Sequence, residues 1–413
     1  MLFLYYSVTF ACLFISLQDS VYASNIASRL ARRTARHING LAKDLNVALD
    51  VVLFSAQKQP QVQLTTHSQV VFCKPGTGST STGIPSASST RTASSVASSS
   101  TGVAVSTPWK LVEEHSGSSF FDGWTFTNAP DVTTGGVVNY VDSGTASSNN
   151  LTQITSAGTA IMRVETTPVV TGNRQSIRIT TNNVYNTGLW ILDAVHIPSG
   201  CGTWPAFWTN GPNWPAGGEI DIVEGVGDST NDQATLHTIE GCSLSSTSSS
   251  ALGITGTTVT STDCVSTGGG CGIRSDSTVS YGAAFNSNGG GVFTMTLNSS
   301  GIAVWFFERS AIPSDITAGT PLPGAWGTPF AWWSSPTCNI SEFFGFQSTI
   351  FDTTLCGQLA GAVWSDSGSP GQAQSCATRT GVSDCVTFVQ NNGAAMEEAY
   401  WEVNSVQIYQ IPS

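Results

Sequence analysis

The stretch Gly217-Gly-Glu-Ile-Asp-Ile-Val-Glu-Gly-Val226 decides how this chain is interpreted, because it sets three acids among β-branched residues. Ile and Val at this density favour a strand. In a regular strand alternate residues share a face, so Glu219 and Asp221 point one way and Glu224 points the other. One extra residue at Val223, a β-bulge, returns Glu224 to the face of the other two, and bulges collect beside active sites. The stretch therefore predicts a bulged strand with three carboxyl groups on one face.

This arrangement suits the hydrolysis of a glycosidic bond. About four rises of ~3.3 Å separate Glu219 from Glu224, which puts their Cα atoms ~13 Å apart. If each side chain leans roughly 4 Å inward, the carboxyls approach the ~5–5.5 Å that retaining glycosidases use. The segment therefore predicts a catalytic pair.

Two other interpretations of the acids fit the sequence less well. A solvated sheet face would mix Lys or Arg among its acids, and none occurs between Gly200 and Gly270. A calcium site would take oxygen ligands from Asn, Asp and Gly along an irregular turn, not from Ile-Asp-Ile-Val. We therefore favour the catalytic interpretation.

The same residues resemble glycoside hydrolase family 16. The run Glu219–Glu224 is similar to that family's signature in the bulged form of laminarinase-like endo-1,3(4)-β-glucanases. Gly200–Pro215 and Ala234–Thr238 look like its flanks in fungal members, and Tyr400–Tyr409 is similar to its last strand. The resemblance covers roughly residues 108–413. It implies an all-β fold, a concanavalin A-like β-jelly-roll sandwich of two antiparallel sheets, whose concave sheet forms the glucan cleft.

The resemblance also implies catalytic roles, which spacing alone does not assign. Glu219 would be the nucleophile that forms a glycosyl-enzyme. Glu224 would be the general acid that protonates the leaving oxygen and then the base that activates water. Asp221 would hydrogen-bond the nucleophile and share its proton, so the three carboxyls would titrate as a coupled set.

Aromatic side chains are the first candidates for substrate binding, because flat sugar faces stack on rings. Trp208 and Trp214 stand before the acids between Pro and Gly, and the resemblance favours both as walls of the cleft. Trp333 would either close the far side of the cleft or pack in the core. Other tryptophans are expected to pack in the β core, namely Trp124, Trp190, Trp305 and Trp401.

Two polar residues complete the predicted binding site. The resemblance suggests that His237 contacts Glu224 or the substrate, slightly ahead of a purely structural role. Arg178, ahead of Arg174, is a candidate to hydrogen-bond sugar hydroxyls with its guanidinium group, although it would equally suit an exposed strand position.

The chain from Trp109 onward has a β pattern. Short alternating runs recur, as in Ile177–Thr180, Leu189–Leu192 and Val292–Leu297. The runs 292–297 and 302–307 flank Asn298-Ser-Ser-Gly301, which predicts a hairpin. About 300 residues of this kind favour one large two-sheet sandwich.

Composition divides the chain into four segments. Residues 1–23 read as a signal peptide, with a retained membrane anchor as the alternative. Residues 24–75 form a basic segment that would be a propeptide, a surface contact or a solvated helix. Residues 76–107 are a Ser/Thr-rich linker that cannot bury a core, and residues 108–413 form the glycoside hydrolase catalytic domain.

Cysteine usage favours an extracellular protein. Eight cysteines lie inside the predicted catalytic domain and fit up to four disulfides of open connectivity. Zinc is disfavoured because no cysteine pair has a short spacing with His. Three sequons at Asn150, Asn298 and Asn339 suit surface turns of a secreted chain.

Charge restricts the partners. Residues 1–107 carry a net charge of +5 and residues 108–413 a net charge of −17. Such a domain repels nucleic acid and anionic lipid, whereas a neutral β-glucan needs no opposite charge. We expect a monomer without a catalytic cofactor, a bound metal at the site or stable membrane insertion. A structural calcium ion, known in this superfamily, has no compelling ligand set in the sequence.

The resulting hypothesis is a secreted, retaining endo-β-glucanase acting on β-1,3-glucans or mixed β-1,3/1,4-glucans. A glucan transglycosylase is the nearest alternative, because a sugar hydroxyl then replaces water in the second step. A lectin-like glucan binder is the alternative from another class. An intact Glu219 and Glu224 pair speaks against it, because binding a neutral glycan needs no opposed carboxylates. A cell-wall structural protein would explain only the Ser-rich region.

Overall fold

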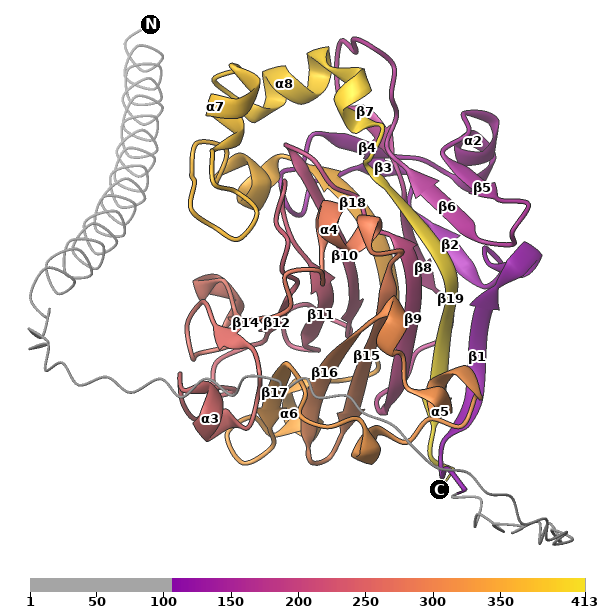
Figure 1. Cartoon of the computed structure of the whole chain (residues 1–413), viewed down its shortest axis with the longest axis vertical. Coiled ribbons are helices and arrows are strands. Elements are labelled where there is room, and N and C mark those ends of the chain that lie inside the picture. Colours follow the sequence, from indigo (N-terminus) through magenta and orange to yellow (C-terminus); the bar gives the residue numbers. More distant parts are fainter. Residues whose placement is uncertain (1–105, 413) are drawn as a thin grey trace, which may run out of the picture. The chain divides into compact units, whose positions relative to one another are not determined.

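A computed structural model describes residues 106–412 of the chain. The predicted signal peptide (1–23), basic segment (24–75) and nearly all of the linker (76–107) lie outside the described residues. Within the described range, two eight-stranded sheets with antiparallel pairing account for most of the fold. Figure 1 shows them facing each other, so the predicted two-sheet β-sandwich is confirmed.

The first large sheet has its strands in the order β17, β16, β15, β9, β19, β6 and β5. Strand β1 also pairs with β19, along residues 405–410, whereas β6 pairs with residues 400–403 of the same strand. The bounds are β1 Lys110–Ser116, β5 Thr152–Ile154, β6 Ala160–Arg163, β9 Gly188–His196, β15 Gly291–Asn298, β16 Gly301–Glu308, β17 Ala331–Ser334 and β19 Tyr400–Gln410.

The second large sheet has the order β13, β14, β12, β11, β10, β18, β8 and β2. Its central strands carry the acidic stretch and both flanks on which the family resemblance rests. The bounds are β2 Trp124–Phe126, β8 Arg178–Thr181, β10 Thr203–Asn210, β11 Glu219–Glu224, β12 Gln233–His237, β13 Thr257–Thr258, β14 Cys271–Arg274 and β18 Ser348–Leu355.

Smaller elements cover the ends of the sandwich. A three-stranded sheet consists of β3 (Ala129–Pro130), β4 (Val138–Tyr140) and β7 (Arg174–Ser176). All the described α-helices are short, consistent with the absence of a long 3.6-residue period in the sequence. They are α2 Ser143–Ser148, α3 Ser249–Leu252, α4 Gly282–Ser287, α5 Ser314–Thr317, α6 Ile340–Phe343, α7 Cys376–Thr380 and α8 Cys385–Asn391.

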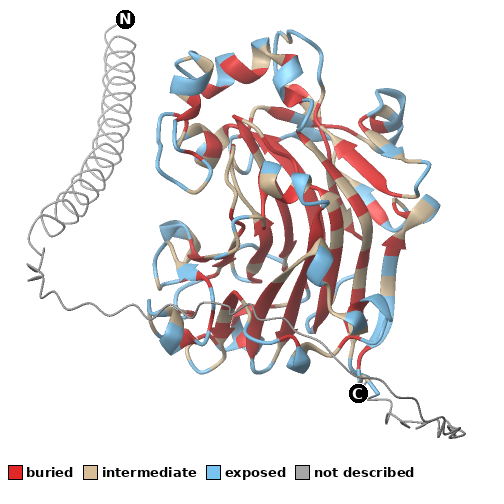
Figure 2. Cartoon of the chain, viewed as in Figure 1, coloured by how far each residue is buried: buried red, intermediate tan, exposed pale blue. Residues whose placement is uncertain are grey.

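The core lies between the two large sheets, where alternate strand residues are apolar. Figure 2 shows the strands mostly buried and the connecting loops exposed. Trp190 and Trp401 from one sheet share a buried cluster with Phe207 and Phe351 from the other. The hairpin predicted around residues 298–301 is present, with Asn298 paired to Gly301.

Trp333 belongs to this core, so its suggested place in the cleft is wrong. Its side chain is fully buried on β17, far along the first sheet, and it packs in the same cluster as Trp190. The residue alternates with Trp332 along a four-residue strand, and the pleat turns Trp333 inward. The other tryptophans expected to pack are buried, namely Trp124, Trp190, Trp305 and Trp401.

All eight cysteines of the domain form disulfides, as predicted. The pairs are Cys201–Cys376, Cys242–Cys338, Cys264–Cys271 and Cys356–Cys385. This pairing removes the zinc alternative for these thiols. Among residues 106–412, no helix has the length and apolarity needed to cross a bilayer.

The disulfides should differ in their contribution to stability. Cys201–Cys376 closes a loop of 175 residues, whereas Cys264–Cys271 closes one of seven. A disulfide that closes a longer loop removes more entropy from the unfolded chain, so we expect the Cys201→Ser/Cys376→Ser variant to lose about 3 kcal/mol more than Cys264→Ser/Cys271→Ser. Urea unfolding of both variants against the parent protein measures this, and equal losses would contradict it.

Candidate active site

The predicted bulge in β11 is present. Relative to β12, Asp221 pairs with Thr235 and Glu224 pairs with Gln233, so three steps on β11 match two on its neighbour. Relative to β10, Val223 stays paired with Phe207 and Ile222 is the extra residue, which moves the predicted bulge by one position. Ile222 and Val223 are consecutive but both buried in the core. The bulge therefore returns Glu224 to the face of Glu219 and Asp221.

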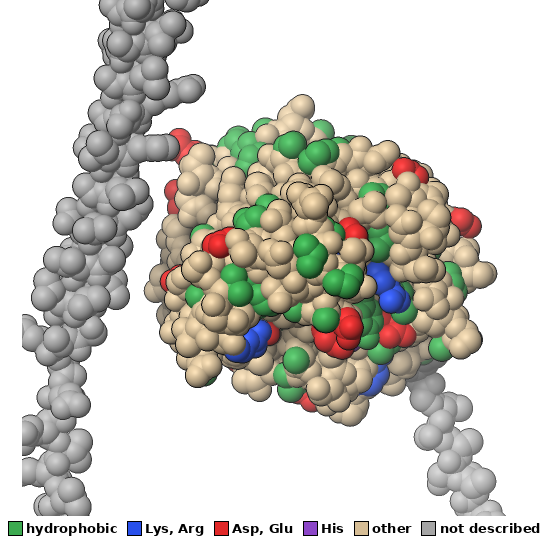
Figure 3. All heavy atoms as spheres, turned by 90° about the horizontal axis from the view of Figure 1, so that it is seen from above, with side chains coloured by type: hydrophobic (Ala, Val, Ile, Leu, Met, Phe, Trp, Pro, Cys, Tyr) green, Lys and Arg blue, Asp and Glu red, His purple; other side chains and the backbone are tan. Residues whose placement is uncertain are grey.

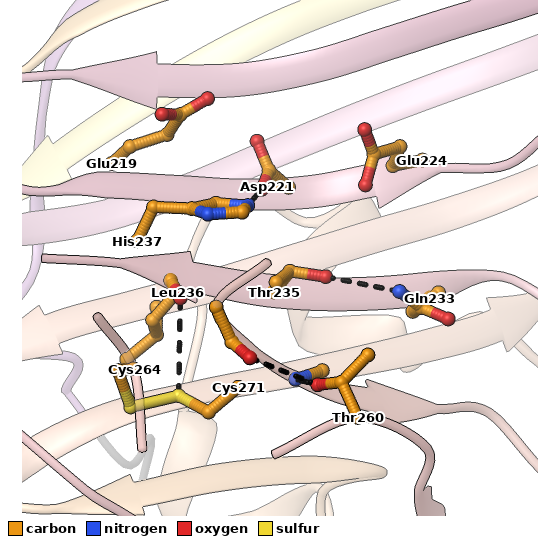
Figure 4. A network of polar contacts seen from close by, with 12 residues as sticks. Glu219, Asp221, Glu224, Gln233, Thr235, Leu236, His237, Thr260, Cys264 and Cys271 are labelled. Carbon is orange, nitrogen blue, oxygen red and sulfur yellow. Dashed lines mark hydrogen bonds and ion pairs between the residues drawn. A yellow bond between two sulfur atoms is a disulfide. The ribbon is translucent and has the colours of Figure 1, made fainter. Parts of the chain in front are cut away.

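We call this face of the second sheet the site face. It lies opposite the core, because Ala206, Trp208 and Ile350 form a small apolar cluster of their own there. Figure 4 shows the three carboxyl groups of β11 projecting to the same side, with His237 below Asp221. The strand register sets Trp208 beside Asp221 and His237 beside Glu219.

Glu219 lies at the start of β11, next to the loop that carries Trp214. The Trp214 indole N–H donates a hydrogen bond to the Glu219 carboxyl, and the Trp214 side chain is 54% exposed. An exposed ring that holds a carboxyl group is well placed to contact a ligand. The prediction that Trp214 belongs to the site is therefore consistent with the structure.

Glu224 lies at the end of β11, and Trp204 of β10 holds it. The Trp204 indole N–H donates to Glu224 Oε1 at 2.8 Å. Trp204 was not among the residues predicted for the site. Its even spacing from Trp208 along a strand was a usable signal, because residues four apart share a face.

Asp221 is the most buried of the three acids and lies between the two glutamates in the sequence. His237 Nε2 is 3.3 Å from Asp221 Oδ2, so the carboxyl group that His237 contacts is Asp221 and not Glu224, and the predicted contact with the substrate stays a prediction. The register explains this difference, because β12 aligns His237 with Glu219 and points its ring along the row of acids.

The three carboxyls have raised pKa values. Burial, then the charge of Asp221, raises the pKa of Glu219 and of Glu224 to about 8 in each case. Burial and the charge of Asp352 raise the pKa of Asp221 to about 8. Like charges this close cannot all ionise near neutral pH. The cluster therefore retains protons at the pH where free carboxyls have lost theirs.

The surroundings distinguish the two glutamates. His237, the Trp214 indole and the charge of Arg178 all lower the pKa of Glu219. Glu224 has the Trp204 hydrogen bond and His237, but Asp221 and Glu219 both raise its pKa. The charge of Arg178 thus acts on Glu219, and both glutamates keep a pKa of about 8.

Arg178 and Trp208 extend the site face away from the acids. The Arg178 guanidinium carbon lies 5.0 Å from the centre of a Trp208 ring, in a cation–π contact. Trp208 is only 8% exposed, and its indole N–H donates to Asp352 Oδ1 at 3.1 Å. Trp208 therefore forms the floor of this face rather than a free-standing wall.

Asp352 supports this floor and was not recognised in the sequence. Its second oxygen accepts a hydrogen bond from the Tyr140 hydroxyl at 3.1 Å. In the strand register, Asp352 of β18 lies opposite Arg178 of the adjacent strand β8. Burial raises the pKa of Asp352 to about 6. A lone acid in the apolar run of β18 was the only signal, and its partners come from distant strands.

Arg174 lies outside the site. Its guanidinium is buried and donates to the backbone carbonyls of four residues, so it has a structural role. These residues are Glu165, Thr167, Val389 and Gln390. The preference for Arg178 over Arg174 therefore agrees with the geometry.

One group among the described residues has the composition of a metal site, at Cys201, Asp228 and Cys376. The two cysteines are joined to each other as a disulfide, so their sulfurs are not thiolate ligands. The group does not fit a metal ion. The expected absence of a catalytic metal and the suggestion of structural calcium both stay predictions.

Asp221 should make stability depend on pH. Its pKa in the folded protein is raised from 3.8 to about 8, so its contribution to stability is full below pH ~4 and is lost as the pH rises towards 8. We expect urea unfolding to give a lower free energy at pH 8 than at pH 5. Asp221→Asn should remove on the order of 2 kcal/mol of that difference. An unchanged pH dependence in the variant would contradict the raised pKa.

Comparison with known proteins agrees with this geometry. Residues 124–409 match the family described as "XgeA-like, catalytic GH16 domain". A probable glycosidase of Schizosaccharomyces pombe is 42% identical over 308 residues, which cover 73% of this chain and 69% of that protein. Endo-1,3(4)-beta-glucanase xgeA of Emericella nidulans is 38% identical over 309 residues, covering 73% of this chain but 47% of that protein.

Two solved structures are similar in fold and sequence. GH16 Laminarinase 16A of Phanerochaete chrysosporium, with 6-O-glucosyl-laminaritriose in its donor and acceptor sites, is 36% identical with a TM-score of 0.65. An elongating GH family 16 beta-1,3-glucosyltransferase is 36% identical with a TM-score of 0.66. The matches cover 73% of this chain and 99% and 100% of those chains. The chain belongs to glycoside hydrolase family 16.

Proposed function

We propose that this protein is a secreted, retaining endo-β-glucanase that hydrolyses β-1,3-glucans or mixed β-1,3/1,4-glucans. The observation that carries the proposal is the bulge in β11, which puts Glu219, Asp221 and Glu224 on one face beside an exposed indole. The names of relatives such as Endo-1,3(4)-beta-glucanase xgeA and Laminarinase 16A support the substrate class.

In the first step, the Glu219 carboxylate attacks the anomeric carbon and forms a glycosyl-enzyme. Glu224 donates its proton to the glycosidic oxygen, which leaves with the rest of the chain. The charge of Arg178 and the indole of Trp214 lower the pKa of Glu219, the indole of Trp204 lowers that of Glu224, and the charge of Asp221 raises both. Because both pKa values are about 8, we assign the base and the acid from the order of the two residues in the family resemblance.

In the second step, Glu224 accepts a proton from water as the water attacks the glycosyl-enzyme, and Glu219 is released. Asp221 lies between them and takes part in the same proton equilibrium. The His237 Nε2 atom lies 3.3 Å from Asp221 Oδ2. No step requires a cofactor.

The surface supports a neutral substrate. Figure 3 shows one face of the domain with few Lys and Arg side chains, a scatter of Asp and Glu, and mostly uncharged atoms. Neutral sugars bind through hydrogen bonds and aromatic faces and do not require complementary charge. Four disulfides suit an oxidising compartment, which supports secretion.

Transglycosylation is the second candidate, since a similar structure is an elongating beta-1,3-glucosyltransferase. The two reactions share the first step and differ in the acceptor. A lectin-like role is disfavoured by the geometry, because burying three acids on one face without catalytic use would only lower stability.

Substrate tests check the reaction. We expect reducing sugar from laminarin and lichenan but not from carboxymethyl cellulose, with release lost in Glu219→Gln. Products should be shorter than the substrate at every laminarin concentration. Longer products would favour the transglycosylase, and glucan binding without release in either protein would favour the lectin.

Azide rescue checks the order of the two glutamates. Glu219→Ala and Glu224→Ala should each lower laminarin hydrolysis at least about 100-fold. With an activated aryl β-glucoside of laminaribiose, azide should give an α-glycosyl azide in Glu219→Ala, because azide replaces the nucleophile. In Glu224→Ala it should give the β-anomer, because azide attacks the glycosyl-enzyme. NMR of the products distinguishes the anomers, and the opposite pattern would reverse the assignment.

A further inference from the structure

The bulge gives Glu224 an unusual backbone partner. Its N–H donates a hydrogen bond to a side chain, Asp232 Oδ1, at 3.0 Å. Asp232 directly precedes β12 and is fully buried. In a regular β-ladder this N–H would donate to a backbone carbonyl of the neighbouring strand. Here it donates to the carboxyl group of Asp232, which therefore holds the end of β11.

Asp232 is itself held from two sides. Its N–H donates to Ser280 Oγ at 2.9 Å, and its carbonyl accepts from the Ser275 N–H at 2.8 Å. Among the described residues, its second carboxyl oxygen Oδ2 has no hydrogen-bond partner, nor does the buried Tyr281 hydroxyl. The backbone hydrogen bonds of Asp232 thus fix the position of its carboxyl group, and only Oδ1 of that group takes part in a hydrogen bond.

The residue after Glu224 is also clamped. A Cβ atom placed on Gly225 would lie 2.6 Å from Cζ of the Tyr281 ring, so the ring covers the backbone at Gly225. Only glycine allows this close approach. The backbone that follows the bulge is therefore held at two points: the Asp232 carboxyl contacts it at Glu224, and the Tyr281 ring contacts it at Gly225.

Burial and charge agree with a neutral Asp232. Burial raises its pKa well above the ordinary range, and the charges of Glu224 and Asp221 raise it further, against hydrogen bonds from the Glu224 and Gln233 backbone. A neutral carboxyl offers one acceptor and one donor, and the amide of Asn offers the same pair. Asn is therefore the conservative replacement at this position.

We propose that Asp232 is a positioning residue for the general acid, whose backbone it anchors at the bulge so that the Glu224 carboxyl keeps its place. The inference rests on the proposed role of Glu224. The Asp232 carboxyl accepts its hydrogen bond from the main chain of Glu224. We therefore expect its effect on the reaction to pass through the position of that residue.

The test uses leaving groups. Cleavage of laminarin requires protonation of its glycosidic oxygen. A 2,4-dinitrophenyl β-laminaribioside does not require it, because 2,4-dinitrophenolate is a good enough leaving group to depart unprotonated. Asp232→Ala should lower kcat on laminarin about 100-fold with KM within about twofold, since misplacing a catalytic group by ~1 Å has that effect. Formation of the glycosyl-enzyme from the aryl substrate, followed as the dinitrophenolate burst, should change less than about fivefold. Asp232→Asn should restore most of the laminarin rate.

Two controls separate this from a loosened fold. Asn231→Ala removes a neighbouring buried hydrogen bond, from Asn231 to the Ser275 carbonyl, without touching the Glu224 anchor. It should lower the unfolding midpoint but leave the ratio of laminarin to aryl rates unchanged. If Asp232→Ala does not fold, Asp232→Leu keeps the volume and still removes the acceptor.

Glu224→Gln is measured in parallel. If it shows the leaving-group dependence and the Asp232 variants slow both substrates equally, the inference is wrong and the role of Glu224 stands. If Glu224→Gln slows both substrates equally, the assignment of the general acid is wrong, and the inference is overturned with it. A laminarin rate in Asp232→Asn as low as in Asp232→Ala would also overturn the inference.

Discussion

The site depends on one irregularity in hydrogen bonding, the extra residue between Asp221 and Glu224. A strand without it would turn Glu224 into the core among Ile and Val, where an unpaired carboxyl is strongly unfavourable. With it, Ile222 and Val223 both face the core, and the two glutamates share the opposite face. The apolar pair thus fixes the bulge from one side of the sheet, and the placement of the acids follows on the other.

The bulge brings carboxyl groups of like charge together. Only a few contacts from surrounding residues offset the repulsion between them. Trp214 and Trp204 each give one indole N–H to one glutamate, and His237 lies against Asp221. An indole donor adds no charge, so it positions a carboxyl without fully stabilising its ionised form. The pKa values therefore stay raised, and a carboxylic acid remains available as a proton donor at a pH where free Glu is ionised.

The sequence contained the strand chemistry but not the register. Alternation of Glu219, Ile220 and Asp221 predicted the shared face, and the bulge followed from a third acid out of phase. The extra residue was predicted at Val223, but a single strand's sequence does not show its neighbour, and the pairing with β10 leaves Ile222 unpaired. Trp333 was misplaced for a related reason, since strand faces depend on which neighbours a short segment joins. Asp352 and Asp232 could not be found because their partners come from strands and loops distant in sequence.

The raised pKa values of the site also bear on the stability of the domain. Raised pKa values on Glu219, Asp221, Glu224 and Asp232 mean that the folded state loses stability as these groups ionise. The compensation must come from features that do not touch the site. Cys201–Cys376 ties the start of β10 to α7 and so constrains the chain just before the strand that carries Trp204 and Trp208. A disulfide restricts the unfolded chain, so this cross-link stabilises the domain without contacting the acids.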